Sequence, residues 1–458
     1  MHKQVDKETS YVLKTTKSGH MTCQVTIGKQ NLLLHSAYDP VKEAQQFVAP
    51  HIDKIQGKDK IIVYGLGCGH HIVELIKVTK ESHIKIEVWE FNTGLYELVK
   101  TKNIIDNLLI DSRVSIYVSH DKKEIVEKVA HFNSESDYII MHQASVKVIP
   151  RWLNDIKEIF EIFQLNVSNM IGTKDKLNEH FAINVVTAKF DKNNVLFRLL
   201  ANVPMVLVSA GPSLQKNIAF LKKYHEHIFI GAVGTALQPL LNHEIIPDFF
   251  MLTDSAEIMS CQFANVSESM QKLIPLFYLS TVMPSVVSQY AGSKIMLLQQ
   301  GMEQAEKLAK ELNVVAVQTG GSVATTLLDW MVQLGAKQIC FVGQDLAWPN
   351  NQTHISGANS YKQLAENSLQ SLREIDDYFR QGKVRTPANL YAYKKWIEEY
   401  IWQHPEIDFF NATQGGAYIK GCQHVDFESF MRSICFDGDM QFYKEKFLQA
   451  IDIIMKSI

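Results

Sequence analysis

Short apolar runs recur along most of the chain, and amphipathic stretches with helical periodicity separate many of them. In the first third, residues 60–77 predict a buried strand, a glycine-rich turn and an amphipathic helix. Further strands are expected to end at Glu90 and to span 114–119 and 137–142. Alternating strands and helices are typical of a parallel sheet covered on both faces. Residues 1–150 are therefore predicted to form a Rossmann-like α/β domain.

A second and longer strand–helix alternation begins at Met205. Before it, residues 151–200 have helical periodicity and predict a helical linker. Residues 201–360 predict a central α/β domain with a mainly parallel sheet, and residues 361–458 a helical C-terminal domain with one irregular patch at 409–421. The strands expected in the central domain are MVLVSA (205–210), HIFIGAV (227–233), DFFMLTD (248–254), PLFYLS (275–280), KIMLLQ (294–299) and QICFVGQD (338–345).

Composition narrows the class of protein. The 458 residues carry a net charge of -3, which argues against nucleic acid as the main partner. The six cysteines form no C-x-x-C pair, so neither a disulfide framework nor a zinc site is indicated. The start of the chain has no apolar signal segment, and no later stretch approaches the roughly 20 apolar residues of a membrane span. We therefore expect a cytoplasmic protein without a membrane partner.

The turn within VLVSAGPSL (206–214) is the first candidate for ligand binding, because loops at the carboxyl ends of parallel strands collect ligands. Gly211 allows close approach of a ligand, Pro212 follows it, and Ser213 can cap the next helix, whose N–H groups favour an anion. No Gly-Lys-Ser/Thr ends this turn, so a P-loop for a magnesium triphosphate is not predicted. The alternative is a plain strand-to-helix turn.

The next two loops at this edge add a glycine, a hydroxyl and a carboxylate. Gly234 and Thr235 follow the second strand at a predicted helix start. Asp254 ends the third strand, where a carboxylate can meet a ribose, a metal or an acceptor. A helix-capping role for Asp254 is an equally open interpretation.

Paired glycines open a long amphipathic helix later in the central domain. Thr319, Gly320, Gly321 and Ser322 combine flexible backbone with flanking hydroxyls. Such a turn can form a nest of N–H groups that binds phosphate or carboxylate.

The loop after the last central strand, GQDLAWPNNQTHISG (343–357), is polar and rich in asparagine. It carries Asp345 and His354, and a polar composition suits ligand binding better than packing. His354 is a candidate general acid or base, because imidazole titrates near neutral pH.

The N-terminal turn 65–69, with Glu90 about 20 residues further on, taken alone resembles a methyltransferase or dinucleotide site. In that interpretation Glu90 would bind a ribose. Cys68, His70 and His71 lie close together in the sequence, but no second ligand cluster accompanies them. They are therefore predicted to be structural rather than metal ligands.

Taken in order, the central motifs resemble the motility-associated factor (Maf) family of bacterial flagellin glycosyltransferases. The motifs are VLVSAGPSL, GAVGTALQPLLNHEIIPDFFMLTD, TGGSVATTLLDWMVQLGAKQICFVGQDLAW and NATQGGAYIKG, and they span roughly residues 180–425. The central domain is similar to that of bacterial sialyltransferases, which use a CMP-activated nonulosonic acid. A single phosphate needs a helix N-terminus and backbone N–H groups, but no P-loop lysine.

The resemblance implies transfer of a pseudaminic or legionaminic acid from its CMP-activated donor to Ser or Thr hydroxyls of flagellin, for flagellum assembly and motility. It implies contact of Gly211, Pro212 and Ser213 with the nucleotide. It also implies support of the phosphate or sugar carboxylate by Thr319, Gly320, Gly321 and Ser322, and closure of the pocket by Asn411 and Thr413. The catalytic base would be His354 or, as second candidate, Asp345. No resident cofactor is predicted, and a magnesium requirement stays open.

Three alternatives stay open. An archaeal pterin pyrophosphokinase family is similar in AGPSL and in the Gly-x-Asp loop, and it transfers diphosphate from ATP with magnesium to 6-hydroxymethylpterin. A methyltransferase would act through the N-terminal glycine turn. A non-catalytic flagellin-binding protein would capture flagellin without nucleotide affinity.

Overall fold

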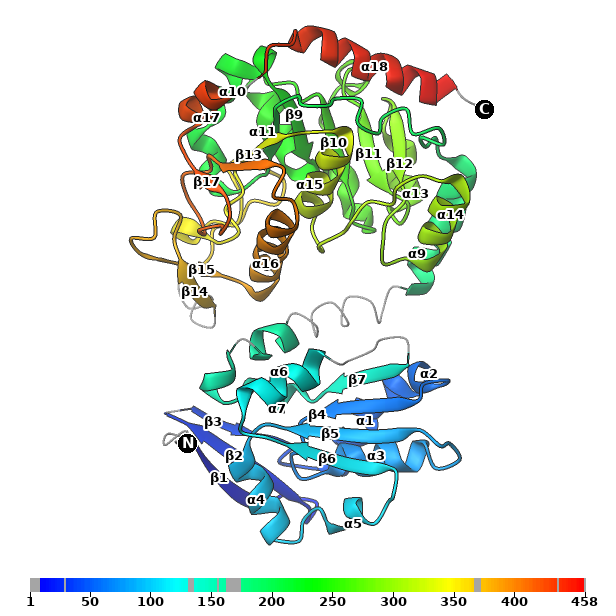
Figure 1. Cartoon of the computed structure of the whole chain (residues 1–458), viewed down its shortest axis with the longest axis vertical. Helices are drawn as coiled ribbons and strands as arrows, with labels where there is room; N and C mark the ends of the chain where they lie inside the picture. The colour runs from blue at the N-terminus through cyan, green and yellow to red at the C-terminus, as the bar shows by residue number, and fades with distance from the viewer. Residues whose placement is uncertain are drawn as a thin grey trace. The chain divides into compact units, whose positions relative to one another are not determined.

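The chain divides into two compact units, 1–171 and 172–458, which are described separately. The computed structural model shown in Figure 1 describes residues 9–28, 30–130, 136–154, 156–161, 174–365, 372–434 and 436–456. Within these residues, none of the helices combines the length and hydrophobicity that a membrane crossing needs.

Unit 1 contains two sheets. The strands are β1 (Thr9–Thr15), β2 (Met21–Ile27), β3 (Gln30–Leu33), β4 (Lys60–Tyr64), β5 (Lys85–Glu90), β6 (Val114–Val118) and β7 (Asp137–Met141). The last four form a parallel sheet in the order β6–β5–β4–β7, which confirms the predicted α/β arrangement. β1, β2 and β3 form an antiparallel sheet that the sequence analysis passed over as a polar start. One face of β1 is exposed, and its only apolar residues, Tyr11, Val12 and Leu13, make a run too short to stand out as a strand.

Short helices connect the strands of unit 1. They are α1 (Pro40–Val48), η1 (Ala49–His51), α2 (Ile52–Ile55), α3 (His70–Val78), α4 (Thr93–Thr101), α5 (Asp106–Leu109), α6 (Lys122–Ala130), α7 (Gln143–Lys147) and η2 (Arg151–Leu153). α3 begins directly after the glycine-rich turn, as predicted.

Unit 2 is built on one parallel sheet. Its strands are β8 (Met205–Val208), β9 (Phe229–Val233), β10 (Phe249–Leu252), β11 (Leu276–Leu279), β12 (Lys294–Leu297), β13 (Gln338–Val342), β16 (Asp408–Asn411) and β17 (Gln423–His424). The spatial order is β12–β11–β10–β9–β8–β13–β16–β17, with every neighbouring pair parallel. Each of the six strands expected in the central domain is present. The strand order reverses between β8 and β13, which makes this pair the topological switch point.

The C-terminal region contributes strands as well as helices. β16 and β17 extend the sheet beyond β13, and β14 (Arg373–Asp376) pairs with β15 (Lys383–Thr386) as an antiparallel hairpin (Figure 1). The sequence predicted this region as helical with an irregular patch. The patch at 409–421 includes most of β16, whose apolar run is too short to stand out beside the neighbouring helices.

Helices surround the sheet of unit 2. They are α9 (Lys174–Thr187), η3 (Pro212–Lys216), α10 (Ile218–Tyr224), η4 (His225–His227), α11 (Gly234–Asn242), η5 (Glu257–Gln262), α12 (Glu268–Gln271), α13 (Pro284–Gln289), α14 (Glu303–Leu312), α15 (Val323–Leu334), η6 (Pro349–Asn351), α16 (Ala388–Gln403), α17 (Phe427–Ser433) and α18 (Met440–Lys456).

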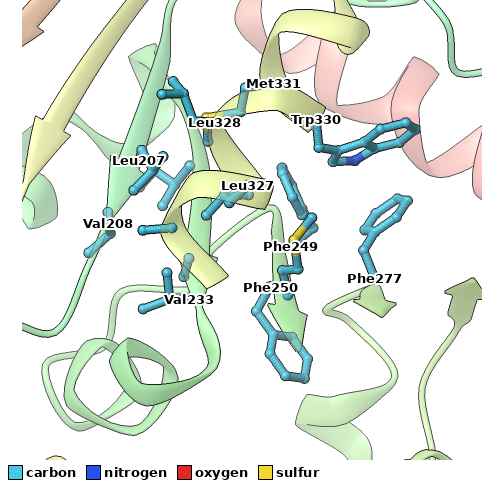
Figure 2. Packing of buried hydrophobic residues seen from close by; sticks show 14 of the residues in the cluster. Leu207, Val208, Val233, Phe249, Phe250, Phe277, Leu327, Leu328, Trp330 and Met331 are labelled. Atoms are coloured by element: carbon cyan, nitrogen blue, oxygen red, sulfur yellow. The ribbon is translucent and has the colours of Figure 1, made fainter. Parts of the chain in front are cut away.

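The central helix of the core is α15. Figure 2 shows its apolar residues, among them Leu327 and Met331, facing residues of β8, β9 and β10. Trp330 packs against Phe277 of β11 with ring centroids 5.3 Å apart. A Cβ on Gly231 of β9 would lie 2.4 Å from Met331 Cε, so this glycine lets the helix approach the sheet. The packing fixes where the N-terminus of α15 lies relative to the carboxyl ends of the strands.

Candidate active site

The turns after β8 and β13 lie side by side at the switch point. The Gly211 N–H donates to the Gly343 carbonyl oxygen over 2.9 Å. Gly343 has φ of +66°, and a Cβ on it would lie 2.2 Å from the Ser209 carbonyl oxygen. A side chain at this position is excluded both by backbone conformation and by space. The sequence therefore brings two glycine turns into contact at the point where doubly wound sheets bind ligands.

Asp345 connects these turns and is almost fully buried. Its Oδ1 accepts a hydrogen bond from Ser213 Oγ at 2.6 Å, and its Oδ2 accepts one from the Ser213 N–H at 3.2 Å. Burial raises the pKa of Asp345 to about 6, although the hydrogen bonds from Ser213 and the charge of Lys216 act against the shift. The carboxylate thus occupies the helix N-terminus where the sequence predicted a bound anion. Ser213 and Asp345 are therefore in contact, as the predicted site requires. However, they form hydrogen bonds with each other rather than offering those groups to a ligand.

Asn411 and Thr413 lie behind the switch point and are fully buried. Thr413 Oγ1 accepts from the Gln344 N–H at 3.1 Å, and Asn411 Oδ1 accepts from the Thr413 N–H at 3.1 Å. The next turn covers Asp345, whose carbonyl oxygen accepts from the Ala417 N–H at 2.7 Å. These contacts fasten β16 to the loop after β13, so both side chains act on the site by holding this loop in place.

The N-terminus of α15 offers unused hydrogen-bond donors. Ser322 and Thr325 form a capping box, and Thr325 Oγ1 also accepts from the Gly320 N–H at 3.1 Å. Among the hydrogen bonds of the described residues, none uses the N–H groups of Gly321, Val323 or Ala324. Free donors at the positive end of a helix dipole are groups that can bind an anion.

Two aromatic side chains of α16 lie beside these donors, and the sequence pattern did not predict this contact. A Cβ on Gly320 would lie 2.4 Å from Trp396 Cδ2, and one on Gly321 would lie 3.0 Å from Tyr393 Cε1. Burial raises the pKa of Tyr393, and the nearby charge of Asp254 adds to the effect. The glycine turn, the aromatic rings and Asp254 are therefore neighbours. No local signal reveals this, because α16 follows the glycines by about seventy residues in the sequence.

Asp254 itself is exposed, two residues after the end of β10. Its Oδ1 accepts a hydrogen bond from the Ala256 N–H at 2.9 Å, which is an Asx turn. Gly234 and Thr235 begin α11 after β9, and a Cβ on Gly234 would lie 2.5 Å from Leu252 Cδ2. Gly234 therefore serves the packing of α11 on β10, whereas the half-buried Thr235 stays at the helix start.

His354 reaches the same edge through the backbone of its loop. The next residue, Ile355, donates its N–H to the Ala210 carbonyl oxygen at 2.8 Å. The imidazole is half-buried, with Nδ1 3.1 Å from Thr353 Oγ1, and burial lowers its pKa. It is therefore neutral at pH 7, the form that a general base requires. Within the described residues, no hydrogen bond or ion pair joins His354 to Asp345.

The loop between them contains strained backbone. Leu346, Asn350 and Asn351 have φ values of +50°, +53° and +60°. A left-handed leucine is unusual and costs about 1–3 kcal/mol, so surrounding contacts must hold it in place. Thr386 Oγ1, at the end of the β14–β15 hairpin, donates to the Leu346 carbonyl oxygen at 2.8 Å. Such strain is concentrated at functional sites in folded proteins.

The N-terminal glycine turn differs from its sequence interpretation. A Cβ on Gly65 would lie 2.3 Å from Ser145 Cβ, and one on Gly67 would lie 2.3 Å from His35 Nε2, so protein atoms fill the space beside both glycines. Glu90 is fully buried and accepts from the Leu66 N–H at 3.0 Å and the Asn92 N–H at 2.8 Å. This arrangement argues against the interpretation in which Glu90 binds a ribose, because the buried carboxylate already bonds the turn itself.

Two hollows in the described surface lie away from these residues. One is lined by Asp59 and Lys85 at the amino ends of β4 and β5, and another by Phe190 and Gln333 in unit 2. Neither is lined by a predicted site residue. We place the candidate site at the carboxyl edge of the unit 2 sheet on the grounds of topology, free donors and strain.

An eight-stranded parallel sheet with polar loops at its switch point defines a doubly wound α/β protein of the kind that binds ligands at this edge. Residues 168–351 match the family model described as 6-hydroxymethylpterin diphosphokinase MptE-like. The match includes the turns at Gly211, Gly321 and Asp345 and ends before His354 and Asn411. None of the curated proteins matches the chain.

Among solved structures, the chain is similar to the MAf glycosyltransferase from Magnetospirillum magneticum AMB-1. The sequence identity is 15% and the TM-score 0.49, over 97% of this chain and 74% of that one. The family in that printed title is the one that the sequence motifs resemble. Likeness at this level carries no information on the reaction.

Proposed function

We propose that the protein is a glycosyltransferase that moves a nonulosonic acid, of the pseudaminic or legionaminic acid type, from a CMP-activated donor to Ser or Thr hydroxyls of flagellin. The observation that carries the proposal is the set of free N–H groups on Gly321, Val323 and Ala324 beside the ring of Tyr393. One phosphate can be bound by such donors without a lysine or a metal. The order of the central sequence motifs, which resembles that of the Maf family, supports a CMP-activated nonulosonic acid as the donor.

Each part of the donor has a candidate partner in this arrangement. The phosphate lies at the N-terminus of α15, with the hydroxyls of Thr319 and Ser322 beside it. The aromatic side chains of α16 suit the base, since a nucleobase can stack on an aromatic face. Asp254, exposed and close to Tyr393, suits a ribose or sugar hydroxyl. Ser213 and Asp345 act as positioning residues, because each is buried and satisfied by the other.

His354 is the proposed catalytic base. The acceptor hydroxyl oxygen forms a bond to the anomeric carbon of the sugar, the bond from that carbon to the phosphate oxygen breaks, and CMP leaves. The acceptor proton passes to the imidazole, which is neutral because burial lowers its pKa. A His354→Ala variant that transfers sugar at the wild-type rate would remove His354 from this role.

The test of the site uses proline at the first position of α15. Val323→Pro removes one free N–H, yet proline suits this helix position and Ser322 before it is extended, with φ of −134° and ψ of 159°. Loss of one hydrogen bond to a charged phosphate should weaken CMP binding by about 10-fold or more in calorimetry. Val323→Ala, which shortens the same side chain but keeps the N–H, is the matched control. Equal affinity of the two variants would refute the phosphate position.

A second candidate function rests on the family match to residues 168–351. It is transfer of diphosphate from ATP to the hydroxyl of 6-hydroxymethylpterin, with release of AMP. Calorimetry with CMP and with ATP, each with and without magnesium, separates the two functions. Binding of CMP without magnesium favours sugar transfer. ATP binding only with magnesium, together with AMP release in the presence of the pterin, would replace the first proposal.

A further inference from the structure

Three buried histidines meet beside the glycine turn of unit 1. His35 follows β3, His71 lies in the first turn of α3, and His142 follows β7, three elements that can be found in Figure 1. One ring nitrogen of each lies within 4.8 Å of those of the other two. The three residues are 4%, 1% and 7% exposed. Such burial is unusual for polar side chains, because their hydrogen-bonding atoms must then find partners inside the protein. The sequence concealed the cluster because its members come from distant segments.

The second ring nitrogen of each histidine faces a partner. His71 Nε2 lies 2.8 Å from the Gly65 carbonyl oxygen, and His142 Nδ1 lies 2.8 Å from Ser145 Oγ. His35 Nδ1 lies 3.7 Å from Glu43 Oε2. Metal-binding histidines in proteins are oriented in this way, by a carbonyl, a hydroxyl or a carboxylate on the far nitrogen.

One buried ring nitrogen of the cluster, His71 Nδ1, has no hydrogen-bond partner among the described residues. A carbonyl oxygen only accepts, so His71 Nε2 carries the proton and His71 Nδ1 has a bare lone pair. This Nδ1 is fully buried and has no hydrogen-bond partner among the residues that the structure describes. A buried acceptor without a donor costs free energy, so such an atom calls for an explanation. An ion bound at the lone pair supplies one.

The protonation state also suits a metal. Burial lowers the pKa of all three imidazoles, that of His71 to about 4, so all are neutral at pH 7. Neutral imidazole is the form that coordinates metal ions. The carboxylate of Glu43, fixed by the Ser36 N–H at 2.8 Å, provides negative charge beside His35.

We propose that His71 Nδ1, His142 Nε2 and His35 Nε2 bind a divalent transition-metal ion, and that this ion is Zn²⁺. Three imidazoles favour zinc over magnesium or calcium, which prefer oxygen ligands. His35 Nε2 accepts from the Cys68 N–H at 2.9 Å, and the ion replaces this N–H as the partner of the lone pair. The site joins the antiparallel sheet, α3 and β7 across the glycine turn. It is independent of the function proposed for unit 2.

The test uses the full chain after treatment with EDTA and titration with ZnCl₂. His71→Gln keeps an amide where Nε2 bonds Gly65 and removes the Nδ1 ligand. His142→Asn keeps an amide where Nδ1 bonds Ser145 and removes Nε2. His51→Gln is the control, since His51 lies in the same unit, with Nδ1 2.9 Å from the Tyr138 hydroxyl, outside the cluster. Both ligand variants preserve the surrounding hydrogen bonds, so folding is retained.

The wild type should bind one Zn²⁺ and unfold at a higher temperature with it. Loss of an outer partner alone weakens metal sites by about 10–100-fold, so loss of a ligand should weaken Zn²⁺ binding by more than about 100-fold. The His51→Gln protein should bind as the wild type does. Substitution of Co²⁺ should give the visible absorption of a tetrahedral site. A wild type that takes up no Zn²⁺, or binding that survives both ligand variants, overturns the proposal.

Discussion

Two glycine turns follow a buried parallel strand in this molecule, and protein atoms fill the space beside both of them, but the edges on which they lie differ. After β4, the turn at Gly65 and Gly67 is filled by Ser145 and His35. After β8, the turn at Gly211 meets Asp345 and lies within an edge where α15 keeps free N–H groups. Both glycines permit close approach of other atoms. A glycine turn therefore predicts close approach of some group, whereas the tertiary structure decides which group approaches and whether donors nearby stay unused.

The two buried carboxylates of these turns extend the comparison. Glu90 and Asp345 each accept backbone N–H bonds from a turn, and burial raises the pKa of both. Neither is free to bind a substrate hydroxyl in the described arrangement. Each holds its turn in shape, as a bound anion would at a helix N-terminus.

The largest expected effect comes from Gly343→Ala. The new Cβ would lie 2.2 Å from the Ser209 carbonyl oxygen at φ of +66°, so the turn must shift. The free energy of unfolding of unit 2 should fall by more than about 3 kcal/mol in urea titrations. Gly301→Ala is the matched control, because Gly301 has φ of +80° and nothing within 4 Å, and it should cost only about 1 kcal/mol. Equal losses would show that close approach does not shape this turn.

A pH-dependent effect is expected from Asp345→Asn. The native pKa of about 6 lies above the ordinary value of 3.8, so the native state binds the proton more tightly than the unfolded state does. The stability that this group contributes is complete below about pH 4 and is lost as the pH rises through 6. Between pH 4 and 7, the unfolding free energy of the wild type should fall by about 2.4 kcal/mol relative to the variant. If the difference in unfolding free energy between wild type and variant stayed constant with pH, Asp345 would not be a buried carboxyl group with a raised pKa.

A smaller effect is expected from Glu90→Gln in unit 1. The amide places a donor where the carboxylate accepts from the Leu66 or Asn92 N–H, so unit 1 should lose about 1–3 kcal/mol of unfolding free energy. The affinity of the full chain for CMP should not change. S-adenosylmethionine should give no heat of binding to the wild type. Tight binding of that cofactor, lost in the variant, would show that the N-terminal turn binds a ligand after all.

The smallest effect on stability is expected from Asp254→Asn. The side chain is exposed, and asparagine keeps the acceptor for the Ala256 N–H, so unfolding should change by about 0.5 kcal/mol or less. Affinity for CMP should nevertheless fall several-fold if Asp254 binds a ribose hydroxyl, since bonds to charged groups contribute about 1.5–3 kcal/mol. Calorimetry at constant pH measures this. Unchanged affinity for CMP and for a CMP-sugar would place Asp254 outside the donor site.

Local pattern was sufficient for the strands and for the edge where the site lies. The apolar runs before Gly211 and Gly343 are buried strands, and parallel strands deliver their carboxyl ends to one edge. Local pattern was insufficient for β16, because a four-residue strand between helices gives too little periodicity. The local pattern also did not predict that Gly321 lies beside Tyr393 or that His71 lies beside His142. Only packing between distant segments brings these pairs together.

The amino-acid sequence was enough to predict two α/β regions, six of the eight strands of the larger sheet, and the glycines that allow close approach. Periodicity and backbone conformation are local properties, so they can be seen without the fold. The tertiary structure alone decided that Asp345 bonds Ser213, that Glu90 bonds its own turn, and that His35, His71 and His142 meet. Those outcomes depend on which side chain fills each space, and packing between distant segments settles that.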